Sequence, residues 1–134
     1  MSVSNSRRIV VGVIAAALMA ACKSYTGPSG GITVPHGDVL IVANASTMAA
    51  NAFSPDTLTI SLAASGKVIW SNGDVGDGVY VGGTTHSLVG DGGTFTLGDQ
   101  APGRTKQFTF TSTGTFGYHC SIHPTMIGAI IVTP

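Results

Sequence analysis

The chain has 134 residues, enough for one domain, and its six basic and six acidic side chains give a formal net charge of zero. Charged residues are only 9% of the chain, and the lack of a basic patch to neutralise phosphates argues against nucleic-acid binding. The six scattered acids give little basis for a calcium array or for a hydrolase with paired carboxylates. Nineteen glycines, with many Thr and Ser residues, favour strands and turns over a helical bundle.

The N-terminus has the features of an export signal. Two arginines precede the uncharged apolar run 9–21, which ends in small residues before Cys22. The run is too short to span a bilayer, which takes about 20 apolar residues. The stretch Leu18-Met19-Ala20-Ala21-Cys22 resembles a bacterial lipoprotein signal. The resemblance implies removal of residues 1–21, acylation of Cys22 as a membrane tether, and export to the bacterial envelope, in the periplasm or at the cell surface. A plain N-terminal membrane anchor is the alternative.

Residues 22–37, rich in Gly and Pro, are predicted to form a flexible tether, so that the globular domain spans 38–134. After loss of residues 1–21, four basic and six acidic side chains remain, a net charge of −2. If Cys22 carries lipid, Cys120 is an unpaired thiol in an oxidising compartment and needs another explanation. A Cys22–Cys120 disulfide is the alternative, but it leaves the histidines near Cys120 without a role.

From residue 38 onward, short apolar runs alternate with turn residues. Leu58, Ile60 and Leu62, for example, alternate with polar residues, which is the period of a half-buried strand. The Gly- and Asp-rich stretch 72–83 predicts a long loop. Such spacing favours an all-β fold, a Greek-key β-sandwich or barrel of about seven to eight strands. The candidate strands are 39–42, 58–62, 68–70, 84–89, 107–111, 116–120 and 127–133.

The segment 118–126 carries the chemistry. Cys120, His123 and Met126 follow one another at three-residue steps between two predicted strands, so they share a tight loop. His86, in a predicted strand after the long loop, is the candidate for a fourth ligand. One thiolate, two imidazoles and a weak axial thioether match a blue-copper electron-transfer site, whereas structural zinc prefers four strong Cys and His ligands. With protein filling every position, this donor set predicts outer-sphere electron transfer rather than catalysis.

Four pieces of the sequence, 53–60, 66–72, 85–87 and 114–126, make residues 38–134 resemble a cupredoxin of the plastocyanin/azurin class. The spacing Cys-x-x-His-x-x-Met is similar to the short ligand loop of amicyanin-like proteins. The resemblance implies one copper ion, alternating between Cu(I) and Cu(II). Its implied ligands are His86, Cys120, His123 and Met126. It also implies that the backbone N–H of Ser87 donates to the Cys120 sulfur and tunes the reduction potential.

These features predict a monomeric electron carrier of the envelope that is not an enzyme. Its partners are expected to be redox proteins that dock on an apolar patch around His123, made by Ile122, Pro124 and Ile127. A copper-binding or copper-delivery module and an accessory subunit of a copper enzyme are the alternatives. A delivery site is usually rich in Met and His, and this chain has four of each.

The enzyme alternative depends on a second histidine site. Multicopper oxidases and copper nitrite reductases place a histidine beside the copper cysteine, as His119 is placed here. Their second sites need at least three more histidines, and only His36 and His119 remain in this sequence. We therefore expect His119 to be structural or exposed, because its strand neighbour Cys120 points to the other face.

Overall fold

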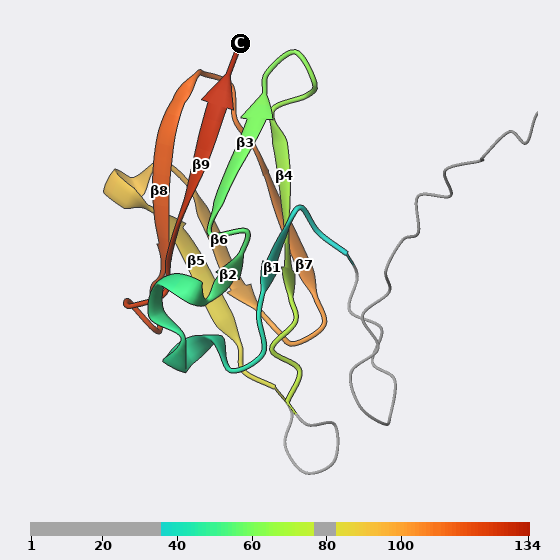
Figure 1. The fold of residues 1–134 in the computed structure, drawn as a ribbon, viewed down its shortest axis with the longest axis vertical. Helices are drawn as coiled ribbons and strands as arrows, with labels where there is room; N and C mark the ends of the chain where they lie inside the picture. The colour runs from blue at the N-terminus through green and yellow to red at the C-terminus, as the bar shows by residue number, and fades with distance from the viewer. Residues whose placement is uncertain (1–35, 77–82) are drawn as a thin grey trace, which may run out of the picture.

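Two β-sheets pack face to face in the computed structural model, which describes residues 36–76 and 83–134 (Figure 1). The predicted signal 1–21 and nearly all of the predicted tether 22–37 lie outside the described residues. Within them, none of the helices is long and apolar enough to cross a membrane. The described elements are β1 (Val39–Ile41), η1 (Ala45–Thr47), η2 (Ala49–Asn51), β2 (Phe53–Ser54), β3 (Thr57–Ser61), β4 (Lys67–Asn72), β5 (His86–Gly90), η3 (Asp91–Gly93), β6 (Thr96–Gln100), β7 (Thr105–Thr109), β8 (Gly114–Cys120) and β9 (Ile127–Thr133).

Each sheet joins strands that are far apart in the sequence. One sheet has the order β2-β1-β4-β7 and the other has the order β3-β9-β8-β5-β6. β1 runs parallel to β4 and β3 runs parallel to β9, whereas the other pairs are antiparallel. Parallel neighbours need crossover connections rather than tight hairpins. The predicted all-β sandwich is therefore confirmed.

The strand count is nine within the described residues, rather than the seven to eight expected. The two strands that the sequence did not indicate are β2 and β6. β2 has only two residues, too few to show a period. β6 carries a single large apolar side chain, Leu97, and it lies at the edge of its sheet beside β5. An edge strand packs fewer neighbours, so its sequence does not need the alternation by which strands are recognised.

The hydrophobic core lies between the two sheets, and Cys120 is the last residue of strand β8 that faces it. Trp70, Phe110 and Tyr118 are buried in this core, and Phe108 and Phe116 pack partly buried against it. Along the end of β8, the buried residues Tyr118 and Cys120 alternate with the partly exposed Gly117 and His119, as a strand with one face on the core requires. Cys120 is the last of this inward-facing series and is fully buried.

Candidate metal centre

The loop between β8 and β9 is closed by its own backbone. β8 ends at Cys120 and β9 begins at Ile127, with His119 opposite Ile127 in the register. The Cys120 N–H donates to the Met126 carbonyl at 3.1 Å, and the Met126 N–H donates to the His123 carbonyl at 3.0 Å. These bonds close the tight loop that the sequence predicted. They also fix the backbone at Cys120 and His123, from which the two side chains extend.

Strand β5 brings the second segment of the site beside this loop. Leu88 lies opposite Cys120 in the antiparallel pairing of β5 with β8. Just beyond the paired residues, the Ser121 N–H donates to the Ser87 carbonyl at 2.8 Å, and the Ser121 hydroxyl donates to the same oxygen at 3.2 Å. His86 is the first residue of β5, so the pairing of β5 with β8 places the His86 ring beside Cys120.

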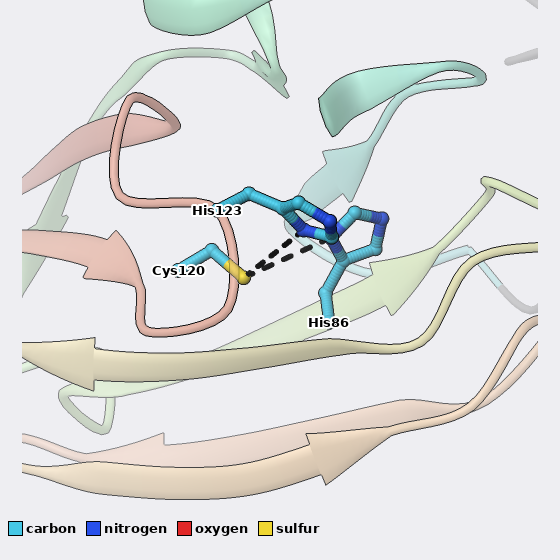
Figure 2. A group of neighbouring side chains, drawn as sticks. All are labelled: His86, Cys120 and His123. Atoms are coloured by element: carbon cyan, nitrogen blue, oxygen red, sulfur yellow. Dashed lines mark hydrogen bonds between the residues drawn. The ribbon is translucent and has the colours of Figure 1, made fainter. Parts of the chain in front are cut away.

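Three side chains converge on one point (Figure 2). The Cys120 Sγ lies 3.8 Å from the Nδ1 atom of His86 and 3.8 Å from the Nδ1 atom of His123. The ring centroids of the two histidines are 5.2 Å apart, and one ligand atom from each of the three residues lies within 4.8 Å of the others. An ion bonded to a sulfur and a nitrogen at ordinary metal–ligand distances separates those two atoms by about 3.6–3.8 Å. The cluster therefore fits a single metal ion.

The cluster is shielded from water on one side. His86 and Cys120 are fully buried, while His123 is half-buried. Met126, the fourth predicted ligand, closes the same loop and is fully buried, and its assignment as an axial ligand stays a prediction. Of the three clustered side chains, His123 is therefore the one that is partly exposed to solvent.

The environment of Cys120 favours the thiolate, the form that binds metals. Burial raises the pKa of the thiol, but hydrogen bonds outweigh burial and lower the pKa to about 6. The Ser87 N–H is 3.4 Å from Sγ, which is the contact that the family resemblance implied. The groups that lower the pKa are His86 and the backbone N–H groups of Ser87, His123 and Ile122.

His86 has a partner that the sequence did not reveal. Its Nε2 atom lies 3.0 Å from the Oδ2 atom of Asp74, and both side chains are buried. Burial lowers the pKa of His86, but contacts with Cys120 and then Asp74 outweigh burial and raise it. Asp74 lies in the Gly- and Asp-rich stretch that sequence predicts only as a loop. Its place twelve residues before His86 carries no spacing signal.

His119 occupies the opposite face of β8, as strand periodicity predicted. Its Nδ1 atom lies 2.7 Å from the Oδ1 atom of Asp91 in η3, and both side chains reach solvent. The Asp91 carboxylate reaches His119 by lying over Gly117, where an added Cβ would overlap it. His36, at the start of the described residues, is exposed. Neither histidine belongs to the metal cluster.

Known structures share this architecture. A purple cupredoxin from Nitrosopumilus maritimus superimposes with a TM-score of 0.60 at 20% identity, covering 71% of this chain and 97% of that one. A Cu-containing nitrite reductase from Thermus scotoductus SA-01 gives a TM-score of 0.51 at 30% identity over 61% of this chain, but this chain covers only 20% of that enzyme. An amicyanin mutant gives a TM-score of 0.44 at 21% identity, covering 57% of this chain and 67% of that one. No protein-family model and no curated protein sequence matches the chain.

Proposed function

We propose that this chain, which has the cupredoxin fold, binds one copper ion and passes single electrons to and from other proteins. The observation that carries the proposal is the buried Cys120 sulfur placed 3.8 Å from the Nδ1 atoms of two histidines on separate segments. Met126 is proposed as a weak fourth ligand, because a loop of this spacing supplies a thioether and blue-copper sites use one.

The donor set supports electron transfer over substrate chemistry. Soft sulfur stabilises Cu(I) and imidazole accepts Cu(II), so a bound copper ion supplies a one-electron couple. The strand pairing of β5 with β8 and the closed loop hold the three side chains in place before any ion arrives. His86 and Cys120 are fully buried, so the protein shields these two side chains from water. This shielding supports a role as an electron carrier rather than an enzyme.

We propose that electrons enter and leave through the His123 ring. Ile122 is 50% exposed and Ile127 is 52% exposed, and among the described residues Met48, at 42%, is the one other exposed large apolar side chain. Two of the three therefore flank the ligand loop, where they would form an apolar docking patch with Pro124. The mature net charge of −2 gives little long-range steering, so contact between redox partners would depend on this patch.

The docking patch is tested by Ile122→Glu. This change should slow electron self-exchange, measured by NMR line broadening, and should leave the copper spectrum almost unchanged because the side chain faces solvent. Lys106→Glu, a change of charge on the exposed strand β7, is the matched control and should have little effect on self-exchange. Equal rates in wild type and Ile122→Glu would place the transfer face elsewhere.

The setting of this carrier is proposed to be the bacterial envelope. The support is the lipoprotein-like segment that ends at Cys22, which lies outside the described residues. A monomer tethered there by acylated Cys22 could exchange electrons with partners in the periplasm or at the cell surface. Cys22→Ser should then alter processing of the chain and lose acyl labelling. Identical fractionation and identical mass of the two proteins would contradict lipidation at Cys22.

A second candidate is an electron-accepting module of a copper enzyme. It is favoured by the likeness to part of a Cu-containing nitrite reductase and by His119, which directly precedes Cys120 and lies on the other face of β8. Within the described residues, His36 and His119 are the histidines outside the cluster, so other ligands of a second site would have to come from a partner. Co-purification of a second copper per chain, lost in His119→Ala, would favour this candidate.

The main proposal is tested by loading the purified protein with Cu(II). We expect one copper per chain and an intense blue or green thiolate-to-copper absorption band. Cys120→Ser should abolish the band, because the charge transfer originates on this sulfur. Cys22→Ser, which changes the other cysteine, is the matched control and should keep it. A band that survives in Cys120→Ser would overturn the site assignment.

A further inference from the structure

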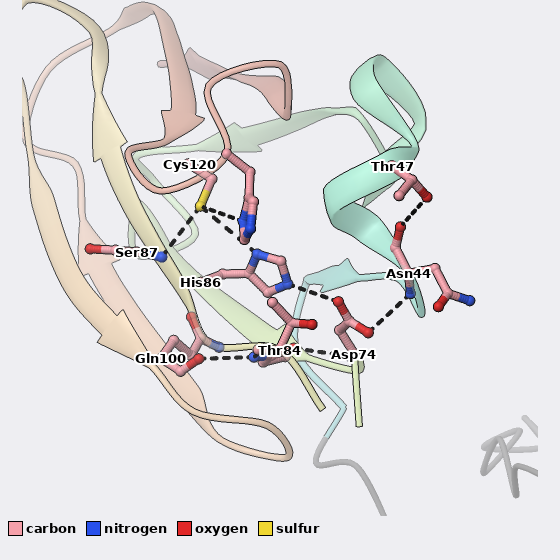
Figure 3. A network of polar contacts seen from close by, with 10 residues as sticks. Asn44, Thr47, Asp74, Thr84, His86, Ser87, Gln100 and Cys120 are labelled. Atoms are coloured by element: carbon pink, nitrogen blue, oxygen red, sulfur yellow. Dashed lines mark hydrogen bonds and ion pairs between the residues drawn. The ribbon is translucent and has the colours of Figure 1, made fainter. Parts of the chain in front are cut away.

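Both nitrogens of the His86 ring have partners in the structure (Figure 3). Nδ1 lies 3.8 Å from the Cys120 sulfur, and Nε2 lies 3.0 Å from the Asp74 carboxylate. A carboxylate only accepts hydrogen bonds, so this contact requires a proton on Nε2. In the neutral ring that proton leaves the lone pair on Nδ1, which is the atom that faces the cluster. The contact with Asp74 therefore selects the tautomer that can bind a metal at the cysteine side.

The Asp74 carboxylate is itself held in place. Its Oδ1 atom accepts the Asn44 N–H at 3.0 Å. Its own backbone N–H donates to the Asn72 side-chain oxygen at 2.9 Å, and its carbonyl accepts the Thr84 N–H at 2.9 Å. The Asn72 amide donates in turn to the carbonyls of Thr84 and Gln100, both at 2.8 Å. The carboxylate is thus held by the chain before η1, and the Asp74 backbone is held by the end of β4 and by the segment that precedes β5.

The charge on Asp74 has His86 as its ionic partner. Among the described residues, the ion pairs are His86–Asp74 and His119–Asp91, and no Lys or Arg approaches Asp74. A buried carboxylate is expensive unless it is paired and hydrogen-bonded. Here the group that pairs with the Asp74 carboxylate is the ring of His86, one of the residues of the cluster. Partners of this kind on a ligand histidine fix the ring and raise its basicity, and their removal typically costs 10–100-fold in metal affinity.

On the basis of the proposed copper site, we infer that Asp74 is a positioning residue that holds His86 in the Nε2–H tautomer and biases the site toward Cu(II). Cu(II) carries one more positive charge than Cu(I), and a nearby buried negative charge stabilises the higher charge more. The bias acts through His86, since the carboxylate contacts the ring nitrogen that faces away from the cysteine. Sequence motifs assign no role to this residue.

The first experiment compares Asp74→Asn with Asp91→Asn. Asn keeps the shape and an acceptor oxygen and removes the charge, while Asp91 provides the matched exposed pair with a histidine outside the cluster. In Asp74→Asn we expect Cu(II) affinity to fall 10–100-fold and Cu(I) affinity to fall less. Each tenfold change in the ratio of the two affinities raises the reduction potential by about 59 mV. Asp91→Asn should leave both affinities and the potential unchanged. An unchanged potential in a folded Asp74→Asn would overturn the inference.

The second experiment needs no metal ion, and its main result comes from the wild type. Nitrogen-15 NMR of the metal-free wild-type protein, at an alkaline pH at which imidazole rings are neutral, should show His86 with its proton on Nε2. Without a metal ion on Nδ1, only the protein can select this tautomer. Asp74→Ala should loosen this preference and speed exchange of that proton, whereas Asp74→Glu should restore part of it. A proton on Nδ1 in the wild type would overturn the inference, even if the variants do not fold.

The two experiments separate this inference from the proposed function. A wild-type protein that shows no blue or green copper band would contradict the proposed function, and the metal-free spectrum would still decide the role of Asp74. A normal copper band together with an unchanged potential in Asp74→Asn would contradict only the inference. A wild-type protein that lacks the band and carries the His86 proton on Nδ1 would overturn both.

Discussion

Two His–Asp pairs have their histidines on neighbouring strands of the same sheet, β5 and β8, and the pairs differ in their surroundings. His86 and Asp74 are 3.0 Å apart, with side chains 0% and 5% exposed. His119 and Asp91 are closer, at 2.7 Å, but their side chains are 36% and 62% exposed. In water such a pair contributes about 0–1 kcal/mol, whereas breaking a buried pair leaves a charge without compensation. Burial, rather than distance, therefore decides which of the two carboxylates can hold the ring of its histidine in a fixed orientation.

The period of a β-strand produces this division. Cys120 faces the core, so its neighbour His119 faces outward, and Asp91 reaches His119 from η3 across Gly117. His86 begins β5 with its ring turned inward, toward the core side of the same sheet. One sheet thus presents one histidine to the metal cluster and another to solvent, each with its own carboxylate.

The largest expected difference between the two pairs is in metal binding. His86→Ala should abolish the copper absorption band, because one of two imidazole ligands is lost, while His119→Ala should keep it. Titration with Cu(II), followed by optical and EPR spectra, measures both variants under the same conditions. A normal spectrum in His86→Ala would break the comparison, since the buried histidine would then not be a ligand.

The two His–Asp pairs can also be compared in the metal-free protein, because of their two histidines only His86 lies beside the Cys120 thiol. The pKa of Cys120 is lowered from 9.0 to about 6, so its thiolate absorbance should titrate with a midpoint near 6. A depressed pKa adds stability that is fully present above the unfolded value of 9.0 and is lost as the pH falls through about 6. Unfolding of the metal-free protein at several pH values, compared with Cys120→Ser, measures this contribution. A midpoint near 9 would contradict the arrangement around the sulfur.

A smaller difference is expected at the glycines beside the two pairs. At Gly83 an added Cβ would overlap the Asp74 carbonyl and the Val75 backbone, which cannot move away easily. Gly83→Ala should cost about 1–3 kcal/mol of unfolding free energy. At Gly117 an added Cβ would meet the Asp91 carboxylate, an exposed side chain that can swing into water.

We therefore expect Gly117→Ala to cost less than about 1 kcal/mol, the range of an exposed ion pair. Urea unfolding of the two variants tests the difference. Equal losses of unfolding free energy would show that Asp91 is held as rigidly as the backbone near Asp74.

The ligand loop could be predicted because its chemistry is local in sequence. Cys120, His123 and Met126 share one loop, and their spacing alone indicated a shared site. His86 was identified as the remaining candidate, and the structure places it beside the cysteine through the pairing of β5 with β8. Most strands were also foreseen, since their apolar residues alternate over one face.

Asp74 and β6 could not be predicted because nothing local marks them. Asp74 reaches His86 only after the ends of β4 and β5 are brought together by hydrogen bonds of Asn72, and an acid among glycines looks like a turn residue. β6 is defined by its pairing with β5 rather than by its own pattern, as Leu97 is its one large apolar side chain. Features fixed by long-range pairing leave little trace in a single sequence.

The position of β9 links the ligand loop to a strand far away along the chain. β9 is the second arm of the ligand hairpin beside β8 and also the parallel neighbour of β3, so Thr57 pairs with Ala129 across most of the described chain. Long-range parallel pairing of this kind closes a large loop and is slow to form. An ion that binds only the folded cluster would stabilise the folded state by mass action. Metal binding at the loop would therefore also stabilise the pairing of β9 with β3.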